Sequence, residues 1–193
     1  MKPASPEPEI ALRIADPSDA PCIGVLATQV FLDTYAMDGI RPSLAREVLH
    51  HLSTGAIARS LADPAKVFLL AERAGHLIGF AELTIGATHD CAGPEATVEL
   101  GRLYVQRAFA GKGVGTRLLA RSEELAHARG AGSLWLTAWV GNRRALAFYA
   151  RRGYVNAGTT MYEFEGEAYE NRVLVRPLDR DRAAQPADGR PRL

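Results

Sequence analysis

Cysteine is scarce in this sequence, and no stretch of it stays apolar over the length of a membrane helix. Two cysteines occur among 193 residues, Cys22 and Cys91, and their spacing matches no zinc site. We therefore expect two reduced thiols, no metal and a cytoplasmic protein. A membrane helix needs roughly 20 apolar residues, and the opening residues MKPASPEPEIALRI lack the apolar segment of a secretory signal. We expect no membrane partner.

An excess of charge of either sign is also missing. The chain has 23 Lys and Arg against 22 Asp and Glu, a formal net charge of +1, without a basic run. Nucleic-acid binding needs clustered positive charge, so no nucleic-acid partner is expected. Hydrophobic residues at 47% and charged residues at 23% are ordinary for a globular protein.

Composition divides the chain into three segments. Residues 1–9 are rich in Pro and Glu, and residues 179–193 are polar with few large apolar side chains. Both are predicted to be flexible ends. Residues 10–178 are long enough to bury one core, and they are predicted to form a single domain.

The periodicity of apolar residues predicts an α/β (α+β) fold, with a mixed, mostly antiparallel sheet of six to seven strands and helices on both faces. Strand patterns lie at 10–17, 67–71, 77–85, 95–105, 133–139, 154–164 and 167–178. Helical patterns lie at 18–35, 43–52, 55–63, 114–130 and 142–153.

A glycine-rich turn separates the strand ending at Val105 from the helix after it. Gly111, Gly113 and Gly115 surround Lys112. The free amides and the dipole at a helix N-terminus favour a bound anion, and glycine lets a ligand approach the backbone. The spacing fits neither a Walker loop nor a dinucleotide fingerprint. A turn without a ligand is the open alternative.

A second motif, N-x-x-A-x-x-F-Y-x-x-x-G-[FY], is matched in full by residues 142–154. Together with residues 110–115, which match Q/R-x-x-G-x-G/A except for Ala110 at its first position, it makes residues 10–178 resemble the GCN5-related N-acetyltransferase family. The resemblance implies acetyl-CoA as acetyl donor, an amine as acceptor and the fold given above. It implies cofactor contacts from Leu103, Tyr104, Val105, Gly111, Lys112, Gly113, Val114, Gly115, Thr116 and Asn142. A homodimer through the closing strands is a further expectation.

Two side chains are predicted to be catalytic. Tyr149 occupies the position of the general acid in the family, and the alternative is a packed aromatic ring beside Phe148. Glu99 is the predicted general base, acting through water, and the alternative is a strand glutamate paired with Arg102 or Lys112. The two-residue strand period predicts that Glu99 shares a face with Leu103 and Val105.

The acceptor is predicted to be a small primary amine. The segment FLDTYAMDGIRPSLAREVL resembles the polyamine-acetylating branch of the family. Tyr35, with Asp33 and Asp38, could attract an amine through charge and ring contact, or could form a solvated helix end. A protein or peptide acceptor and a non-catalytic acyl-CoA sensor are the alternative functions, and the missing Arg or Gln at Ala110 is what favours a sensor.

Overall fold

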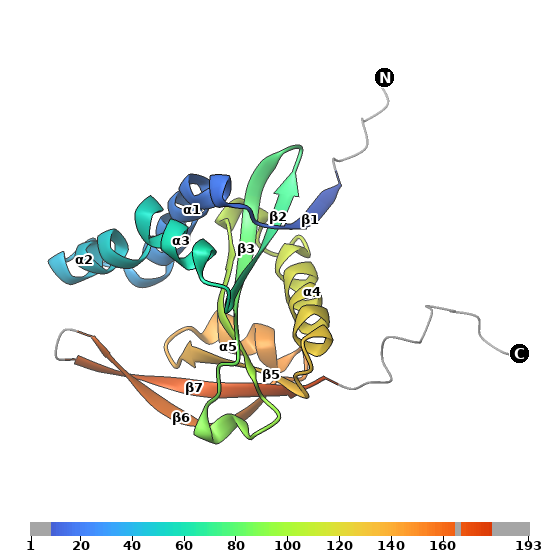
Figure 1. Ribbon diagram of the computed structural model, residues 1–193. Helices are drawn as coiled ribbons and strands as arrows, with labels where there is room; N and C mark the ends of the chain where they lie inside the picture. The colour runs from blue at the N-terminus through green and yellow to red at the C-terminus, as the bar shows by residue number, and fades with distance from the viewer. Residues whose placement is uncertain (1–8, 165–166, 179–193) are drawn as a thin grey trace, which may run out of the picture.

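The computed structural model describes residues 9–164 and 167–178, which form one seven-stranded sheet with helices on both faces (Figure 1). The strands are β1 (Ile10–Ile14), β2 (Lys66–Arg73), β3 (His76–Ile85), β4 (Val98–Val105), β5 (Ser133–Trp139), β6 (Val155–Phe164) and β7 (Glu167–Pro177). The helices are α1 (Ala20–Tyr35), α2 (Pro42–His51), α3 (Thr54–Ala62), α4 (Val114–Ala128) and α5 (Arg143–Ala150). The predicted fold class is confirmed.

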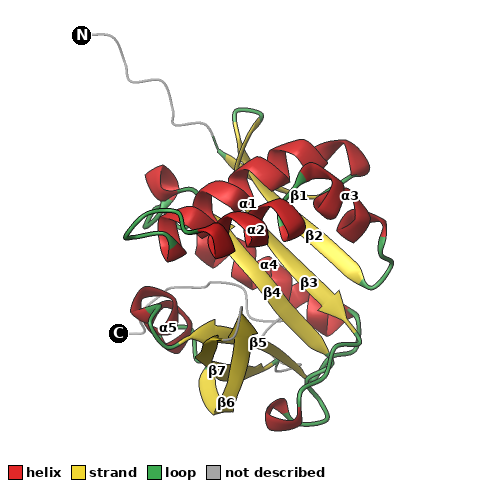
Figure 2. Cartoon of the chain, turned by 90° about the vertical axis from the view of Figure 1, so that its left-hand side faces the viewer, coloured by secondary structure: helices red, strands yellow, loops and turns green. Residues whose placement is uncertain are grey.

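The sheet has the strand order β1-β2-β3-β4-β5-β7-β6, and β4 with β5 is its parallel pair. That pair is short, because its register covers Val98 with Leu134 and Glu99 with Trp135. Beyond these residues β4 and β5 diverge toward the side where α5 lies (Figure 2). The sheet is therefore open in its middle, at the end of β4 that leads into the glycine turn.

Helices cover the two faces of the sheet differently. Helices α1 and α3 pack on one face of β2 and β3, around Phe68, Leu70 and Phe80. Helix α4 packs on the other face, where Leu118 and Leu119 are completely buried or nearly so (Figure 1). Alternate strand residues feed these two cores, as the two-residue period requires.

A β-bulge in β4 changes which residues share a face. Leu100 pairs with Leu83 and Arg102 pairs with Glu82, so Gly101 is the extra residue. Val98 and Leu100 therefore face the α4 core together with Leu103 and Val105. The side chain of Glu99 lies on the opposite face, and the prediction that it shares a face with Leu103 and Val105 was wrong because a bulge breaks the alternation.

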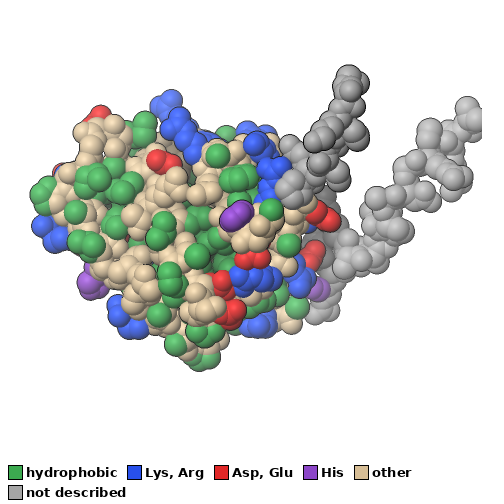
Figure 3. All heavy atoms as spheres, turned by 90° about the horizontal axis from the view of Figure 1, so that it is seen from above, with side chains coloured by type: hydrophobic (Ala, Val, Ile, Leu, Met, Phe, Trp, Pro, Cys, Tyr) green, Lys and Arg blue, Asp and Glu red, His purple; other side chains and the backbone are tan. Residues whose placement is uncertain are grey.

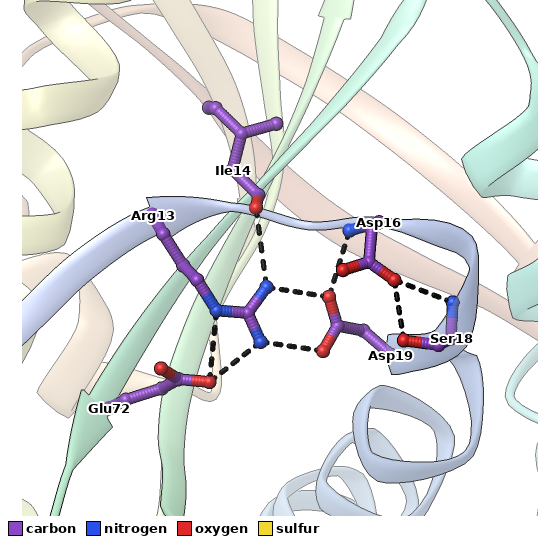
Figure 4. A network of polar contacts seen from close by, with 6 residues as sticks. All are labelled: Arg13, Ile14, Asp16, Ser18, Asp19 and Glu72. Atoms are coloured by element: carbon purple, nitrogen blue, oxygen red, sulfur yellow. Dashed lines mark hydrogen bonds and ion pairs between the residues drawn. The ribbon is translucent and has the colours of Figure 1, made fainter. Parts of the chain in front are cut away.

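A polar network joins the first strand to the first helix (Figure 4). The guanidinium of Arg13 donates to both carboxylate oxygens of Asp19 at 2.7 Å, and to Glu72 on β2 at 2.7 and 3.1 Å. Asp16 caps the turn before α1, accepting from the backbone of Ser18. Bidentate geometry makes the Arg13–Asp19 pair directional, and the network fixes where α1 begins on the sheet.

The surface seen from above in Figure 3 mixes both signs of charge near β1. Hydrophobic side chains are scattered over the part of that face formed by the helices before β2; exposed residues of this region include Val25, Met37 and Leu49. Scattered apolar residues are normal on a protein surface. Each helix of the described chain is too short or too polar to cross a membrane.

Candidate active site

The turn before α4 takes a conformation that favours glycine. Gly111 and Gly113 have φ values of +78° and +83°, and Gly113 is the N-cap of α4. The first bond of the helix runs from the amide of Arg117 to the carbonyl of Gly113 at 3.0 Å. The amides of Val114, Gly115 and Thr116 precede it and have no partner within the helix. They form a cluster of donors at the positive end of α4.

A cavity of about 440 Å³ lies beside this turn, and we call it the loop cavity. Its wall combines the turn with the end of β4, α1 and α5. Of the predicted residues, it is lined by Leu103, Val105, Gly111, Gly113, Gly115, Thr116, Asn142 and Tyr149. Residues from four separate segments of the sequence are thus brought to one cavity.

Helix α5 closes one side of the loop cavity. The side chain of Asn142 accepts a hydrogen bond from the amide of Ala145 at 3.1 Å, which makes Asn142 the N-cap of this helix. Phe148 packs partly against the core, lines the cavity, and lies where a Cβ on Gly115 would touch its ring at 3.5 Å. Helix α4 and helix α5 therefore lie close together at Gly115 and Phe148.

Arg152 places a cation at the edge of the loop cavity. Its guanidinium lies 3.7 Å from the centroid of the Phe148 ring, donates to the carbonyl of Phe148 at 3.0 Å, and donates to the hydroxyl of Thr116 in the first turn of α4. Its Nε atom is buried and has no hydrogen-bond partner in the described part of the chain. Burial, and then the charge of Arg151, lower the pKa of Arg152, and the charge of Glu123 opposes them.

Tyr149 is a buried ring that also reaches the loop cavity. The ring is 8% exposed and packs edge-on against Phe148 and Tyr154. Tyr149 is therefore also part of the core. Burial raises the pKa of its hydroxyl, and the phenols of Tyr104 and Tyr35 raise it further. The phenol is therefore protonated at neutral pH, as an unperturbed tyrosine also is, and can donate a hydrogen bond.

The edge of β4 facing β5 is available beyond Glu99. Residues Arg102 to Val105 pair with β3 on their other side, while β5 has already diverged. In a strand, alternate peptide groups point to opposite edges, so part of this backbone faces the opening between β4 and β5. Such groups need a partner, which a ligand at the loop cavity can supply.

A second cavity, of about 330 Å³, lies on the α1 face of the sheet, and we call it the aromatic cavity. Six aromatic side chains line it: Phe31, Tyr35, Tyr104, Trp139, Tyr162 and Tyr169. The bulge at Gly101 directs Arg102 and Tyr104 to this cavity while Leu103 and Val105 line the other. Strand β4 therefore separates two cavities and contributes to both.

Glu99 lines neither cavity but lies on the face of the aromatic cavity, among charged groups. Glu82 is 2% exposed and binds Lys66 at 2.5 Å and also Arg102. Burial raises the pKa of Glu99, opposed by the charge of Lys66 and reinforced by that of Glu82. The alternative expectation was a pair between Glu99 and Arg102 or Lys112; among the described residues Arg102 instead binds Glu82, and its charge only lowers the pKa of Glu99 slightly against the effect of burial.

Three of the predicted cofactor residues, Tyr104, Lys112 and Val114, do not line the loop cavity. The side chain of Val114 is buried in the core, so only its backbone can serve a ligand there. Lys112 extends over the ring of Phe109, 5.6 Å from its centroid. Tyr104 lines the aromatic cavity, as does Tyr35, which is 39% exposed.

Sequence reasoning missed Arg152 and most of the aromatic cavity. Glu47 and Asn171 line that cavity, whereas Asp33 and Asp38 do not. Trp139 and Asn171 face each other across the β5–β7 register. The alternating pattern of those strands could have placed each residue on a face, but it could not tell which face borders a cavity.

The sheet opening, the glycine-capped helix and the two adjoining cavities define a transferase that brings an anionic donor to a second substrate. The chain belongs to the acetyltransferase (GNAT) family, whose model matches residues 34–154, and it is an N-acetyltransferase.

Both relatives in sequence and a solved structure support this assignment. An uncharacterised N-acetyltransferase of Mycobacterium bovis is 31% identical over 128 residues, which are 66% of this chain and 78% of that protein. Streptothricin acetyltransferase of Streptomyces lavendulae is 30% identical over 105 residues, 54% of this chain and 52% of that protein. The PaiA N-acetyltransferase of Thermoplasma acidophilum, solved with coenzyme A, has the same fold, with a TM-score of 0.67, 22% identity, and coverage of 88% of this chain and 99% of that one.

Proposed function

We propose that this protein transfers the acetyl group of acetyl-CoA directly to a primary amine of a small molecule, with polyamines among the candidate acceptors. Acetyl-CoA is the acetyl donor. The observation that carries the proposal is the turn at Gly111 and Gly113, which lines one cavity together with the first residues of α4 and with Leu103 and Val105 at the end of β4. A diphosphate fits the amide donors of such a turn.

The residues of the loop cavity fit the donor. The amides from Gly111 to Thr116 would hold its pyrophosphate, and Asn142 with the edge of β4 would hold its pantetheine arm. Bound acetyl-CoA supplies a thioester carbonyl. Peptide N–H groups of Leu103, Tyr104 or Val105 that face the opening donate to the carbonyl oxygen as negative charge develops on it.

In this proposal two side chains transfer protons, one as general acid and one as general base. A phenol with a pKa of about 10 is already protonated at neutral pH, and burial raises the pKa of Tyr149 further. Its hydroxyl can hydrogen-bond to the departing thiolate and donate its proton as the thiolate forms. An amine must be neutral to attack, although an alkylamine has a pKa of about 10.4 in water. Glu99 accepts the proton of the amine through water, and its position on the acceptor face of β4 suits that role.

Ala110 removes the side chain that the family pattern places at the start of the turn. Arg152 offers a cation in its place, because it is anchored on Thr116 and Phe148 at the first turn of α4. We assign it the role of supporting the phosphates of the donor. This assignment favours an enzyme over a sensor with a weakened site.

A direct test is release of coenzyme A thiol by the full chain, with acetyl-CoA and a panel of small amines and N-terminal peptides. Thiol release that depends on a small amine, with the acetylated amine identified by mass spectrometry, supports the proposal. Acceptance of peptides alone would favour a protein acetyltransferase. Binding of coenzyme A without turnover of any acceptor would favour a sensor.

A further inference from the structure

The aromatic cavity contains one carboxylate that neither lysine nor arginine neutralises within the described residues. Glu47, on α2, lines the cavity, and its side chain is 18% exposed. Its contacts are the hydroxyl of Tyr162, at 3.5 Å, and the Nε2 atom of His51, at 3.8 Å. The first is at the limit of a hydrogen bond, and the second is an ion pair only when His51 is protonated.

Aromatic rings form a continuous arc through the cavity. The centroids of Phe31 and Tyr35 are 4.8 Å apart, those of Tyr35 and Trp139 are 5.9 Å apart, and those of Trp139 and Tyr169 are 6.5 Å apart. Faces of aromatic rings attract a cation, and several rings arranged around one site recognise ammonium groups. Glu47 adds the opposite charge to this wall.

Both arginines that line the cavity are held in ion pairs. Arg102 shares the buried carboxylate of Glu82 with Lys66. Arg41 lies 3.6 Å from Glu167 and donates to the hydroxyl of Tyr169 at 2.7 Å. Each arginine is thus bound to a carboxylate outside the lining, whereas Glu47 is the carboxylate among the described lining residues.

An unsatisfied acceptor points to the same kind of ligand. Asn171 lines the cavity, on the face of β7 that also carries Val173 and Val175. Its Oδ1 atom is buried and has no hydrogen-bond partner in the described part of the chain. A buried acceptor without a donor costs free energy, and an N–H group of a ligand would remove that cost.

We infer that the acceptor carries a second positively charged group, as a diamine does, and that Glu47 with the surrounding rings binds this group. The inference rests on the proposed function, because the first amine of the same molecule receives the acetyl group. It identifies Glu47 and Trp139 as determinants of acceptor choice. A single amine, or an amine with a carboxylate at its far end, would lack the complementary charge.

The experiment compares three acceptors of similar length: 1,4-diaminobutane, butylamine and 4-aminobutanoate. Thiol release gives kcat/KM for each with the full chain and with Glu47→Gln, Glu47→Asp and Glu163→Gln. Glu163 lies on β6 outside both cavities, so its variant makes the same charge change as a control. Calorimetry in the presence of coenzyme A measures binding of each amine without turnover.

We expect the wild-type protein to prefer the diamine over butylamine at least tenfold in kcat/KM, and Glu47→Gln to lower that ratio at least tenfold. Glu47→Asp should restore part of the ratio, and Glu163→Gln should keep it. An unchanged ratio in Glu47→Gln, or a preference for 4-aminobutanoate, overturns the inference. If no amine is acetylated, the proposed function fails, and calorimetry decides separately: weaker diamine binding in Glu47→Gln supports the charged cage, and equal binding refutes it.

Discussion

The substitution Gly113→Ala tests whether the turn before α4 binds the donor, because its effect on stability can be measured separately from its effect on binding of coenzyme A. Gly113 has a φ of +83°, and a Cβ built there meets no protein atom within 4 Å. The cost to folding is thus conformational, about 1–2 kcal/mol for an L-residue in the left-handed region. For a domain of this size, that lowers Tm by about 2–8 °C.

A matched control exists at the other end of the same helix. Gly130 follows α4, has a φ of +85°, also meets no atom within 4 Å and lines neither cavity. Gly130→Ala should therefore lower Tm by a similar amount. Only Gly113→Ala should weaken binding of coenzyme A, because its Cβ stands where the phosphates approach the amides.

The size of the binding effect follows from the hydrogen bonds at risk. Bonds to a charged group contribute about 1.5–3 kcal/mol each, so losing one lowers affinity roughly ten- to hundredfold. Thermal melting and calorimetric titration of both variants with coenzyme A provide the two quantities. Equal affinity losses in Gly113→Ala and Gly130→Ala would refute the placement of the diphosphate at this turn.

Three further substitutions test the site. Tyr149→Phe should lower kcat at least tenfold while Kd for acetyl-CoA changes little; unchanged turnover would reject a general acid at this position. Arg152→Gln should weaken coenzyme A binding about tenfold, and calorimetry finding no change would remove Arg152 from the phosphate site. Glu99→Gln should abolish the acidic limb of kcat/KM. Burial raises the pKa of Glu99, so the native state binds the proton of this carboxyl group more tightly than the unfolded state does. The stability that this proton contributes is lost as pH rises above about 4.5. Glu99→Gln should therefore have a higher Tm than wild type at pH 7, and an equal or lower Tm would contradict this prediction.

The fold and the loop cavity could largely be predicted from sequence because their determinants are local. Glycines at 111 and 113 adopt positive φ, and Asn142 caps its helix through a contact only three residues away. Spacing in the sequence specifies such features. Arg152 could not be predicted in the same way, because its role depends on Thr116, 36 residues earlier, and on the approach of α5 to α4.

The aromatic cavity depends on contacts that no local pattern encodes. Tyr35 and Trp139 meet only because α1 crosses the opening of the sheet, and Glu47 reaches the same cavity from α2. Asp33 and Asp38 carry the negative charge expected of an amine site, but they are not among the residues that line the cavity. Helical periodicity alone does not determine which side of a helix borders a cavity. The sequence could name candidate acidic and aromatic residues, and tertiary packing determines which of them border the cavity.

The extra residue in β4 determines which face each half of the strand presents. Without the bulge at Gly101, strict alternation from Val98 and Leu100 would turn Arg102 and Tyr104 to the α4 face and Leu103 and Val105 to the α1 face. With it, Leu103 and Val105 line the loop cavity, and Arg102 and Tyr104 line the aromatic cavity. Glu99 then shares the face of Arg102 and Tyr104, so it lies on the side where the proposed amine acceptor would need a general base.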